Sequence, residues 1–249
     1  MKLAIFSDIH SNLEALQACL LHAQSQSVTQ FAFVGDLVGY GADPVACLEI
    51  VVDLLQQGAF AVQGNHDAAA VSGLCETMEI NARESIYWTR AQLGQAERQL
   101  LQNLPLFKQH EDMYFVHACA ETPEQWTYIT GPRQAGRCMQ ATQARLIFSG
   151  HIHQPTLYYK TQSGRAYPQV FYPTPGVALP LLTSRQWLAI VGSAGQPRDG
   201  NPAASYAICD RTLNTLTYFR VPYDHAKTAQ KILAAGLPPR LAQRLERGY

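Results

Sequence analysis

The sequence predicts an α/β fold in which a parallel β-sheet occupies the first half of the chain and antiparallel strands occupy the last third. Short apolar runs at residues 2–6, 31–34 and 59–62 each end in a polar loop, as buried strands do. The segments between these runs have helical periodicity, whereas short β-rich runs follow residue 153. Because parallel strands end at one edge of a sheet, we expect ligands to bind at that edge.

The first β-α unit places two polar side chains after its strand. The strand at residues 2–6 is followed by Ser7-Asp8-Ile9-His10. Ser11 and Glu14 have the spacing of a capping box, and a helical stripe follows at Leu13, Leu16, Cys19 and Leu20. We therefore expect Asp8 and His10 to lie in a strand-to-helix loop.

The next two units repeat this plan. The strand at 31–34 leads into Gly35-Asp36, and Asp43 as N-cap with Pro44 begins a helix that ends at Gly58. The third strand, at 59–62, ends in the sequence Gly64-Asn65-His66-Asp67. The carboxylate of Asp36 is thus expected at the rim in the middle of the sheet.

Residues 68–111 have no strand signal and are predicted to form a helical insertion near the site, with helices at 81–93 and 95–104. A strand at 113–116 ends in His117, and helical pieces are expected at 122–124 and 132–144. A further strand at 146–148 ends in Gly150-His151-Ile152-His153.

The last third of the chain predicts an antiparallel sheet followed by a helical tail. Its β-rich runs lie at residues 157–160, 169–172, 187–191, 205–209 and 215–221. A terminal helix is expected at 224–235, and the Arg-rich segment from Arg240 is interpreted as a solvated helical turn and not as a binding site. No repeat or linker is evident, so residues 1–249 are predicted to form one domain with a C-terminal helical tail at 224–249.

Composition limits the partners of the protein. Nineteen basic and nineteen acidic residues give a net charge of zero, which disfavours strong binding to nucleic acid or to an anionic membrane. The apolar start of the chain is too short for a signal peptide, so a cytoplasmic location is expected.

The cysteines have no Cys-x-x-Cys pairing and are predicted to be reduced core thiols; they are Cys19, Cys47, Cys75, Cys119, Cys138 and Cys209.

Five strand-terminal loops bring imidazole and carboxylate groups to one rim. The set comprises Asp8, His10, Asp36, Asn65, His66, Asp67, His117, His151 and His153. Each motif alone has a structural explanation as a loop pair, a turn or a core histidine. Together they form a nitrogen and oxygen donor set that suits Mn, Fe, Zn, Co or Ni. So many donors exceed the needs of one ion, and two ions about 3.5 to 4 Å apart can share one carboxylate, for which Asp36 is the natural bridge.

The order Asp-x-His, Gly-Asp-x-x-Gly, Gly-Asn-His-Asp, His, Gly-His-x-His resembles the calcineurin-like metallophosphoesterase superfamily between residues 8 and 153. The resemblance implies a four-layer α/β/β/α sandwich with two mixed sheets flanked by helices. It also implies two divalent metal ions, Mn²⁺ being the first choice and Fe, Zn, Ni or Co the alternatives. One ion would be held by Asp8, His10, Asp36 and His153, and the other by Asp36, Asn65, His117 and His151.

The resemblance further implies hydrolysis of phosphoesters by attack of a hydroxide that bridges the two ions. His66 would stabilise or protonate the leaving oxygen, and Asp67 would orient its imidazole. Losing such a group costs about 10² to 10⁴ in rate.

Two segments look like the small prokaryotic phosphodiesterase branch of this superfamily, at residues 35–44 and 192–200. The Asp-Arg-Gly of protein Ser/Thr phosphatases is absent, because Val38-Gly39-Tyr40 stands in its place. We therefore expect Asn65 and Arg198 to bind substrate, the alternative for Arg198 being a turn residue paired with Asp199.

The sequence thus predicts a phosphodiesterase, with phosphomonoesters as further substrates. The alternatives are a dinucleoside polyphosphate hydrolase, a Ser/Thr protein phosphatase-like enzyme, and a non-catalytic metal-bound scaffold. A small phosphorylated substrate is expected, nucleotides being among the candidates. The motifs leave the physiological substrate, the native metal and the oligomeric state open.

Overall fold

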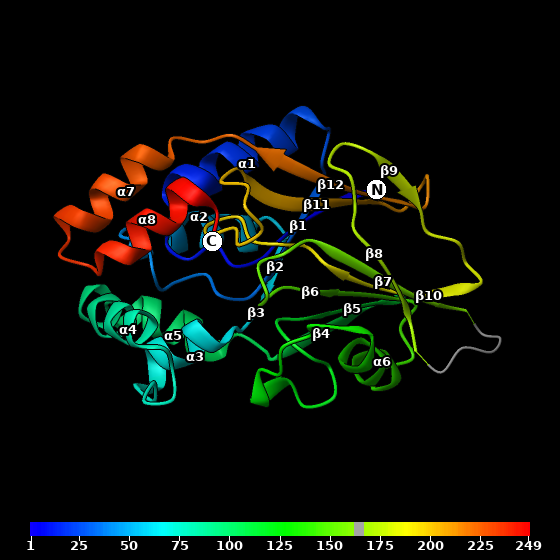
Figure 1. The fold of residues 1–249 in the computed structure, drawn as a ribbon, viewed down its shortest axis with the longest axis horizontal. Helices are drawn as coiled ribbons and strands as arrows, with labels where there is room; N and C mark the ends of the chain where they lie inside the picture. The colour runs from blue at the N-terminus through cyan, green and yellow to red at the C-terminus, as the bar shows by residue number, and fades with distance from the viewer. Residues whose placement is uncertain (162–166) are drawn as a thin grey trace.

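Two six-stranded sheets form the centre of the computed structural model, which describes residues 1–161 and 167–249 (Figure 1). The strand order in the first sheet is β3 (Phe60–Val62), β2 (Gln30–Val34), β1 (Lys2–Phe6), β11 (Ala204–Asp210), β12 (Thr215–Val221) and β9 (Ala178–Pro180). The order in the second is β4 (Phe107–His110), β5 (Met113–Val116), β6 (Leu146–Ser149), β10 (Arg185–Ile190), β7 (Thr156–Thr161) and β8 (Gln169–Phe171).

The first three strands are parallel, as predicted, and β11 pairs with β1 in the antiparallel direction. The prediction of one antiparallel sheet after residue 153 was wrong. Its strands are divided between the two sheets, with β7, β8 and β10 in the second and β9, β11 and β12 in the first. Local β-propensity identifies a strand, but pairing between distant segments determines to which sheet the strand belongs.

Side chains along β1 alternate between the two faces of the first sheet, and both faces are apolar, which explains why the sheets stack. Leu3 and Ile5 face the second sheet, where they pack with Phe115 and Phe148. Ala4 and Phe6 face the outer side and pack among helices such as α1 (Leu13–Ser25) and α2 (Pro44–Gln56). The outer side of the second sheet is covered by α6 (Pro132–Gln140), and a 3-10 turn precedes it at Pro123–Gln125. The fold is therefore the expected four-layer sandwich.

The predicted insertion at residues 68–111 is mostly helical. It contains most of α3 (Asn65–Ser72), all of α4 (Ile80–Gln92) and all of α5 (Gln95–Asn103). The prediction that residues 68–111 contain no strand was wrong, because β4 lies in this range and pairs with β5 at the edge of the second sheet. All four residues of β4 are exposed, so this strand has no apolar pattern by which the sequence reveals it.

The N-terminus of α1 differs from the prediction. Asn12, and not Ser11, is the N-cap, and its side chain accepts a hydrogen bond from the Ala15 amide at 3.1 Å. The Glu14 carboxylate is instead bound by Lys231, at 2.6 Å, from the C-terminal helix α7 (His225–Ala234).

The segment from Arg240 is helical, as predicted, and forms part of α8 (Pro239–Arg247), but this helix is amphipathic and one of its faces is buried. Leu241 and Leu245 are buried in a cluster with Tyr40 and with Ala82 of α4. Figure 1 shows α7 and α8, in orange and red, beside the blue helices and facing α4. The C-terminus therefore lies against the loop that follows Asp36. The single-domain organisation stays a prediction.

All six cysteines are buried and free of disulfides. Within the ranges that the structure describes, no helix has the length and hydrophobicity of a membrane-spanning segment.

Candidate metal centre

The polar loops of both sheets meet at the carboxyl ends of β1, β2, β3, β5 and β6. The side chains gathered there are Asp8, His10, Asp36, Asn65, His66, His117, His151 and His153. All except Asn65 belong to buried residues, with Asp8 and His117 fully buried. Carboxylates and imidazoles are rarely buried to this extent without a partner or a metal.

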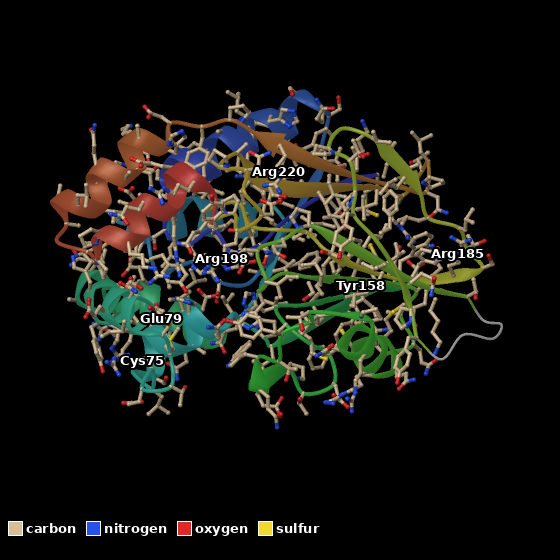
Figure 2. All side chains as sticks on the ribbon, in the orientation of Figure 1. Cys75, Glu79, Tyr158, Arg185, Arg198 and Arg220 are labelled. Atoms are coloured by element: carbon tan, nitrogen blue, oxygen red, sulfur yellow. The ribbon has the colours of Figure 1, made fainter. Side chains whose placement is uncertain are left out.

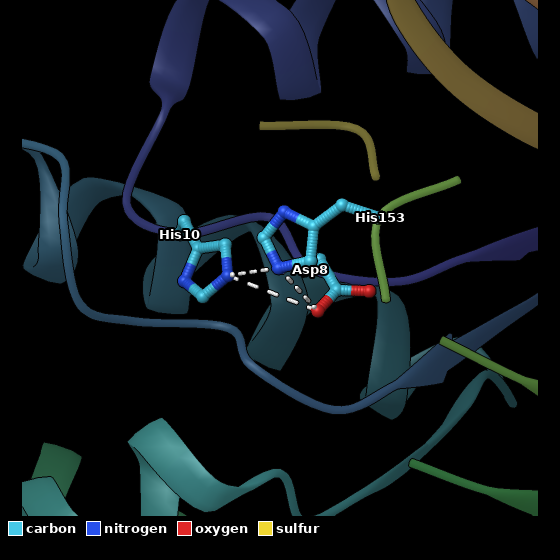
Figure 3. A group of neighbouring side chains, drawn as sticks. All are labelled: Asp8, His10 and His153. Carbon is cyan, nitrogen blue, oxygen red and sulfur yellow. Dashed lines mark hydrogen bonds and ion pairs between the residues drawn. The ribbon is translucent and has the colours of Figure 1, made fainter. Parts of the chain in front are cut away.

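The first group of donors consists of Asp8, His10 and His153 (Figure 3). His153 Nε2 lies 3.2 Å from Asp8 Oδ1 and 3.2 Å from His10 Nε2. His10 Nε2 lies 3.8 Å from the same Asp8 oxygen. Segments about 140 residues apart thus direct three donor atoms to one point.

The second group consists of Asp36, His117 and His151. His117 Nε2 lies 3.3 Å from Asp36 Oδ2, 3.1 Å from His151 Nδ1 and 3.2 Å from Asn65 Oδ1. His151 and His153, two positions apart, therefore address different groups.

Asp36 lies between the two groups. Its Oδ2 is 3.3 Å from His117 Nε2 and 3.7 Å from His10 Nε2. Its Oδ1 accepts a hydrogen bond from the amide of His66, at 2.8 Å, at the start of α3. The carboxylate is thus held by the backbone on one side and faces imidazoles of both groups on the other.

Backbone carbonyls orient three of the imidazoles. His10 Nδ1 is 3.1 Å from the Val38 carbonyl, His117 Nδ1 is 2.8 Å from that of Val34, and His153 Nδ1 is 2.6 Å from that of Gln196. Because a carbonyl only accepts hydrogen bonds, Nδ1 carries a hydrogen in each, and Nε2 is the ring nitrogen directed to the centre. This is the arrangement of metal-binding histidines.

Two donor atoms are left without a hydrogen-bond partner among residues 1–161 and 167–249. They are Asp8 Oδ1 and His151 Nε2, both buried. An unsatisfied buried oxygen or nitrogen costs about 1–3 kcal/mol. The oriented Nε2 atoms, the unsatisfied atoms and the mixed nitrogen and oxygen donors together fit divalent transition-metal ions.

The carboxylates and imidazoles of the centre shift one another's pKa values. Although burial opposes ionisation, the imidazoles of His117 and His66 hold the pKa of Asp36 well below its usual range. Burial lowers the pKa of His117, but Asp36 and Asp8 outweigh it and raise that pKa to about 10. Burial and the charge on His117 lower the pKa of His151 to about 3. The proton that His117 carries faces the carboxylates of Asp36 and Asp8. A cation is therefore suited to the same place.

Five of these residues adopt backbone conformations that side chains other than glycine rarely adopt. Asp8, His10, Asp36, His151 and His153 have φ between 51° and 69°. Such conformations cost about 1–3 kcal/mol each and cluster at functional sites.

The expected contact between Asp67 and the His66 imidazole is not formed. The Asp67 carboxylate accepts hydrogen bonds from the amides of Leu37 at 2.9 Å, Val38 at 3.2 Å and Gly64 at 3.0 Å. In the part of the chain that the structure describes, His66 Nδ1 is buried with no partner. Asp67 therefore braces the loop that carries Asp36, since its two oxygens are occupied by backbone amides.

A cavity of about 540 Å³ lies beside the centre, lined among others by Asn65, His66, His151 and Arg198. The guanidinium of Arg198 donates hydrogen bonds to the Gln196 side chain at 2.9 and 3.3 Å, and its Cζ is 5.5 Å from the centre of the Tyr40 ring. Asp199 pairs with Arg220 and not with Arg198. Arg198 thus lines the cavity, and its role in substrate binding stays a prediction.

The sequence did not indicate several residues around this cavity. Tyr128 stacks on His151 with ring centres 4.0 Å apart, Tyr40 lies 4.4 Å from the His66 ring, and Arg244 of α8 lines the same cavity. Aromatic residues in loops have no distinguishing local pattern. The amphipathic pattern of α8 was the one available signal for Arg244.

Comparisons with known proteins agree with this geometry. Residues 1–213 match the calcineurin-like phosphoesterase superfamily domain. An uncharacterized protein of Methanocaldococcus jannaschii is 32% identical over 98% of this chain and 96% of its own length.

Solved structures give the same result. The chain is similar to a metallophosphoesterase from Sphaerobacter thermophilus, with a TM-score of 0.87 and 36% identity over 100% of this chain and 99% of the other. A hypothetical protein from Pyrococcus horikoshii shares the fold, with a TM-score of 0.80 and 16% identity over 100% of this chain and 98% of the other. Family match and fold agree, and the chain belongs to the calcineurin-like phosphoesterase superfamily.

Proposed function

We propose that the protein is a metal-dependent hydrolase of phosphodiester bonds. The observation that supports this most is the position of Asp36, whose Oδ2 faces His117 at 3.3 Å and His10 at 3.7 Å. One carboxylate between two groups of donors is what two neighbouring ions require.

One ion would be held by Asp8, His10, Asp36 and His153, and the other by Asp36, Asn65, His117 and His151. Mn²⁺ is the first choice for both positions and Fe, Zn, Ni or Co are the alternatives, since these donors mix imidazole nitrogens with carboxylate and amide oxygens. When bound, two such ions polarise phosphoryl oxygens and lower the pKa of water.

His66 acts on the leaving oxygen. Burial lowers the pKa of His66 to about 4, so its imidazole is neutral at pH 7 and retains one N–H to donate. A phosphate anion bound beside it raises this pKa, because negative charge stabilises the imidazolium. His66 therefore stabilises the leaving oxygen by a hydrogen bond or transfers a proton to it.

Arg198 binds the phosphoryl group. Its guanidinium is held by the neutral Gln196 side chain and has no ion pair with a carboxylate in the described ranges. The positive charge is therefore free to pair with substrate oxygens, for which a planar guanidinium is well suited.

Hydrolysis of bis(p-nitrophenyl) phosphate by the manganese-loaded protein tests this proposal, with p-nitrophenyl phosphate measured beside it. We expect metal-dependent turnover of the diester. The His66→Asn variant should lose about 10² to 10⁴ in kcat while keeping its metal content. The control is His110→Asn, a change at an exposed position of β4, which should leave both quantities as in the wild type. A protein with two bound ions and no turnover of either ester would contradict the proposal and favour the non-catalytic scaffold.

A further inference from the structure

Arg244 of α8 lines the cavity together with Arg198, His66 and His151. The family match ends at residue 213, and α8 begins at Pro239. Figure 2 shows Arg198 between α8, in red, and the helices α3 to α5, in cyan to green. A segment beyond the matched domain therefore adds a cation to the candidate site.

The guanidinium of Arg244 has no hydrogen bond and no ion pair with any residue that the structure describes, although the residue is half-buried. The nearby Glu79 carboxylate, which also lines the cavity, accepts hydrogen bonds from the amides of Asn81 at 3.0 Å and Ala82 at 3.3 Å. Glu79 thus caps α4, and Arg244 keeps all its donors available.

Arg198 and Arg244 interact unfavourably in the protein as it stands. Burial lowers the pKa of Arg244, and the positive charge of Arg198 lowers it further. Two like charges that line one cavity are costly unless an anion lies between them. The Tyr40 ring, 5.5 Å from the Arg198 Cζ, packs in the same cluster as Leu241 and Leu245 of α8 and so connects the two arginines.

We propose that Arg244 binds a second phosphoryl group of the substrate, next to the hydrolysed one that Arg198 binds, so that a diphosphate spans the two arginines. The preferred substrates are then organic phosphates with at least two phosphoryl groups, the class to which nucleoside diphosphates and polyphosphates belong. This assignment rests on the proposed function, because the first phosphoryl group must lie at the metal centre. The cavity of about 540 Å³ provides room for both groups.

Competition between ADP and AMP tests the assignment, since the two ligands share a nucleoside and differ by one phosphoryl group. Each is titrated against bis(p-nitrophenyl) phosphate hydrolysis by the manganese-loaded protein at a fixed concentration of free Mn²⁺. We expect ADP to inhibit at about a tenfold lower concentration than AMP, because a charged hydrogen bond contributes about a factor of ten or more. In Arg244→Gln this preference for ADP should disappear, and in Arg244→Lys it should return in part.

Arg247→Gln is the matched control, because Arg247 lies on the same helix and is exposed. It should keep the activity and the preference for ADP of the wild type. Equal inhibition by ADP and AMP in the wild type, or an equal loss of preference in Arg244→Gln and Arg247→Gln, would overturn the assignment.

A binding measurement distinguishes failure of the proposed function from failure of the second phosphoryl site. If the protein does not hydrolyse the diester, calorimetric titration of the manganese-loaded protein with ADP and AMP gives their affinities without turnover. A tenfold preference for ADP that depends on Arg244 would then support the second phosphoryl site, and equal affinities would reject it.

Discussion

Arg198 is directed into the cavity by Gln196, whose side-chain oxygen accepts from two guanidinium nitrogens at 2.9 and 3.3 Å. The Gln196 backbone carbonyl accepts from His153 Nδ1 at 2.6 Å. One residue therefore orients both a candidate metal ligand and the candidate phosphate-binding side chain. The position of Arg198 is coupled in this way to the position of the first donor group.

Replacing Arg198 tests its role in binding. Arg198→Ala should raise KM for bis(p-nitrophenyl) phosphate about tenfold, because a hydrogen bond to a charged group is lost. Steady-state kinetics of the manganese-loaded variant measure this change. Arg133→Ala, an exposed position at the start of α6, is the control. Wild-type KM and kcat in Arg198→Ala would show that Arg198 does not bind the substrate.

At the residue scale, the sequence predicted which side chains meet at the candidate centre, because each follows a strand end in a recognisable polar motif. The role expected of Asp67 was wrong, since its carboxylate binds the amides of Leu37, Val38 and Gly64. Arg244 was missed because its contact with the cavity depends on how α8 packs, which no local pattern encodes.

At the scale of elements, charged contacts hold α7 against α1. The buried Glu14 carboxylate accepts from Lys231 at 2.6 Å, from Lys227 at 3.1 Å and from the Thr228 hydroxyl at 3.0 Å. Asp43, before α2, binds the same Lys231 at 2.8 Å. Since α8 follows α7 directly, these contacts also position Arg244.

The Glu14 contacts make stability depend on pH. Burial opposes ionisation of Glu14, but the hydrogen bonds from Lys231 and Lys227 outweigh it and lower the pKa of Glu14. A carboxyl whose pKa is lower in the folded state stabilises the protein above its ordinary pKa, and this contribution is lost as pH falls through the folded value. Glu14→Gln should therefore reduce the free energy of unfolding by about 1–3 kcal/mol at pH 7, and by less at pH 4.

Urea denaturation at pH 7 and pH 4 measures this difference. Glu84→Gln is the control, because Glu84 is exposed on α4 and has no ion pair within the described residues. An equal effect of Glu14→Gln at both pH values would mean that packing, and not charge, explains the loss.

The sequence predicted most elements, and its errors have physical causes. The edge strand β4 is exposed over its whole length, so it lacks the apolar alternation that reveals a strand. The segment from Arg240 was interpreted by its charge, whereas its apolar stripe, with Leu241 and Leu245, forms the buried face of α8.

At the scale of the whole molecule, the candidate metal centre lies where both sheets end, so candidate ligands that follow β1 and β2 in one sheet and β5 and β6 in the other are held together. Buried donors such as Asp8 Oδ1 have no hydrogen-bond partner among the described residues. Metal binding is therefore expected to stabilise the two sheets against separation.

Thermal unfolding measures this stabilisation. Mn²⁺ at 100 times its dissociation constant adds about 2.7 kcal/mol for each ion bound, which for a chain of this length raises Tm by about 5 to 10 °C per ion. A chelator should reverse the shift, and Asp36→Asn should reduce it strongly. An undiminished shift in Asp36→Asn would place the stabilising ion elsewhere.

The four-layer architecture was the expectation that followed from the family resemblance, and the structure has it. The residues alone predicted the parallel strands β1 to β3, because each is a local apolar run. They did not predict the division of the later strands between two sheets, since the pairing of β11 with β1 joins segments about 200 residues apart.

Anomalous X-ray scattering from crystals soaked in Mn²⁺ tests the central claim most directly. We predict two manganese peaks about 3.5 to 4 Å apart, with the Asp36 carboxylate between them, Asp8, His10 and His153 around one, and His117 and His151 around the other. A single ion that does not contact Asp36, or no ion at these residues, would contradict the shared-carboxylate centre.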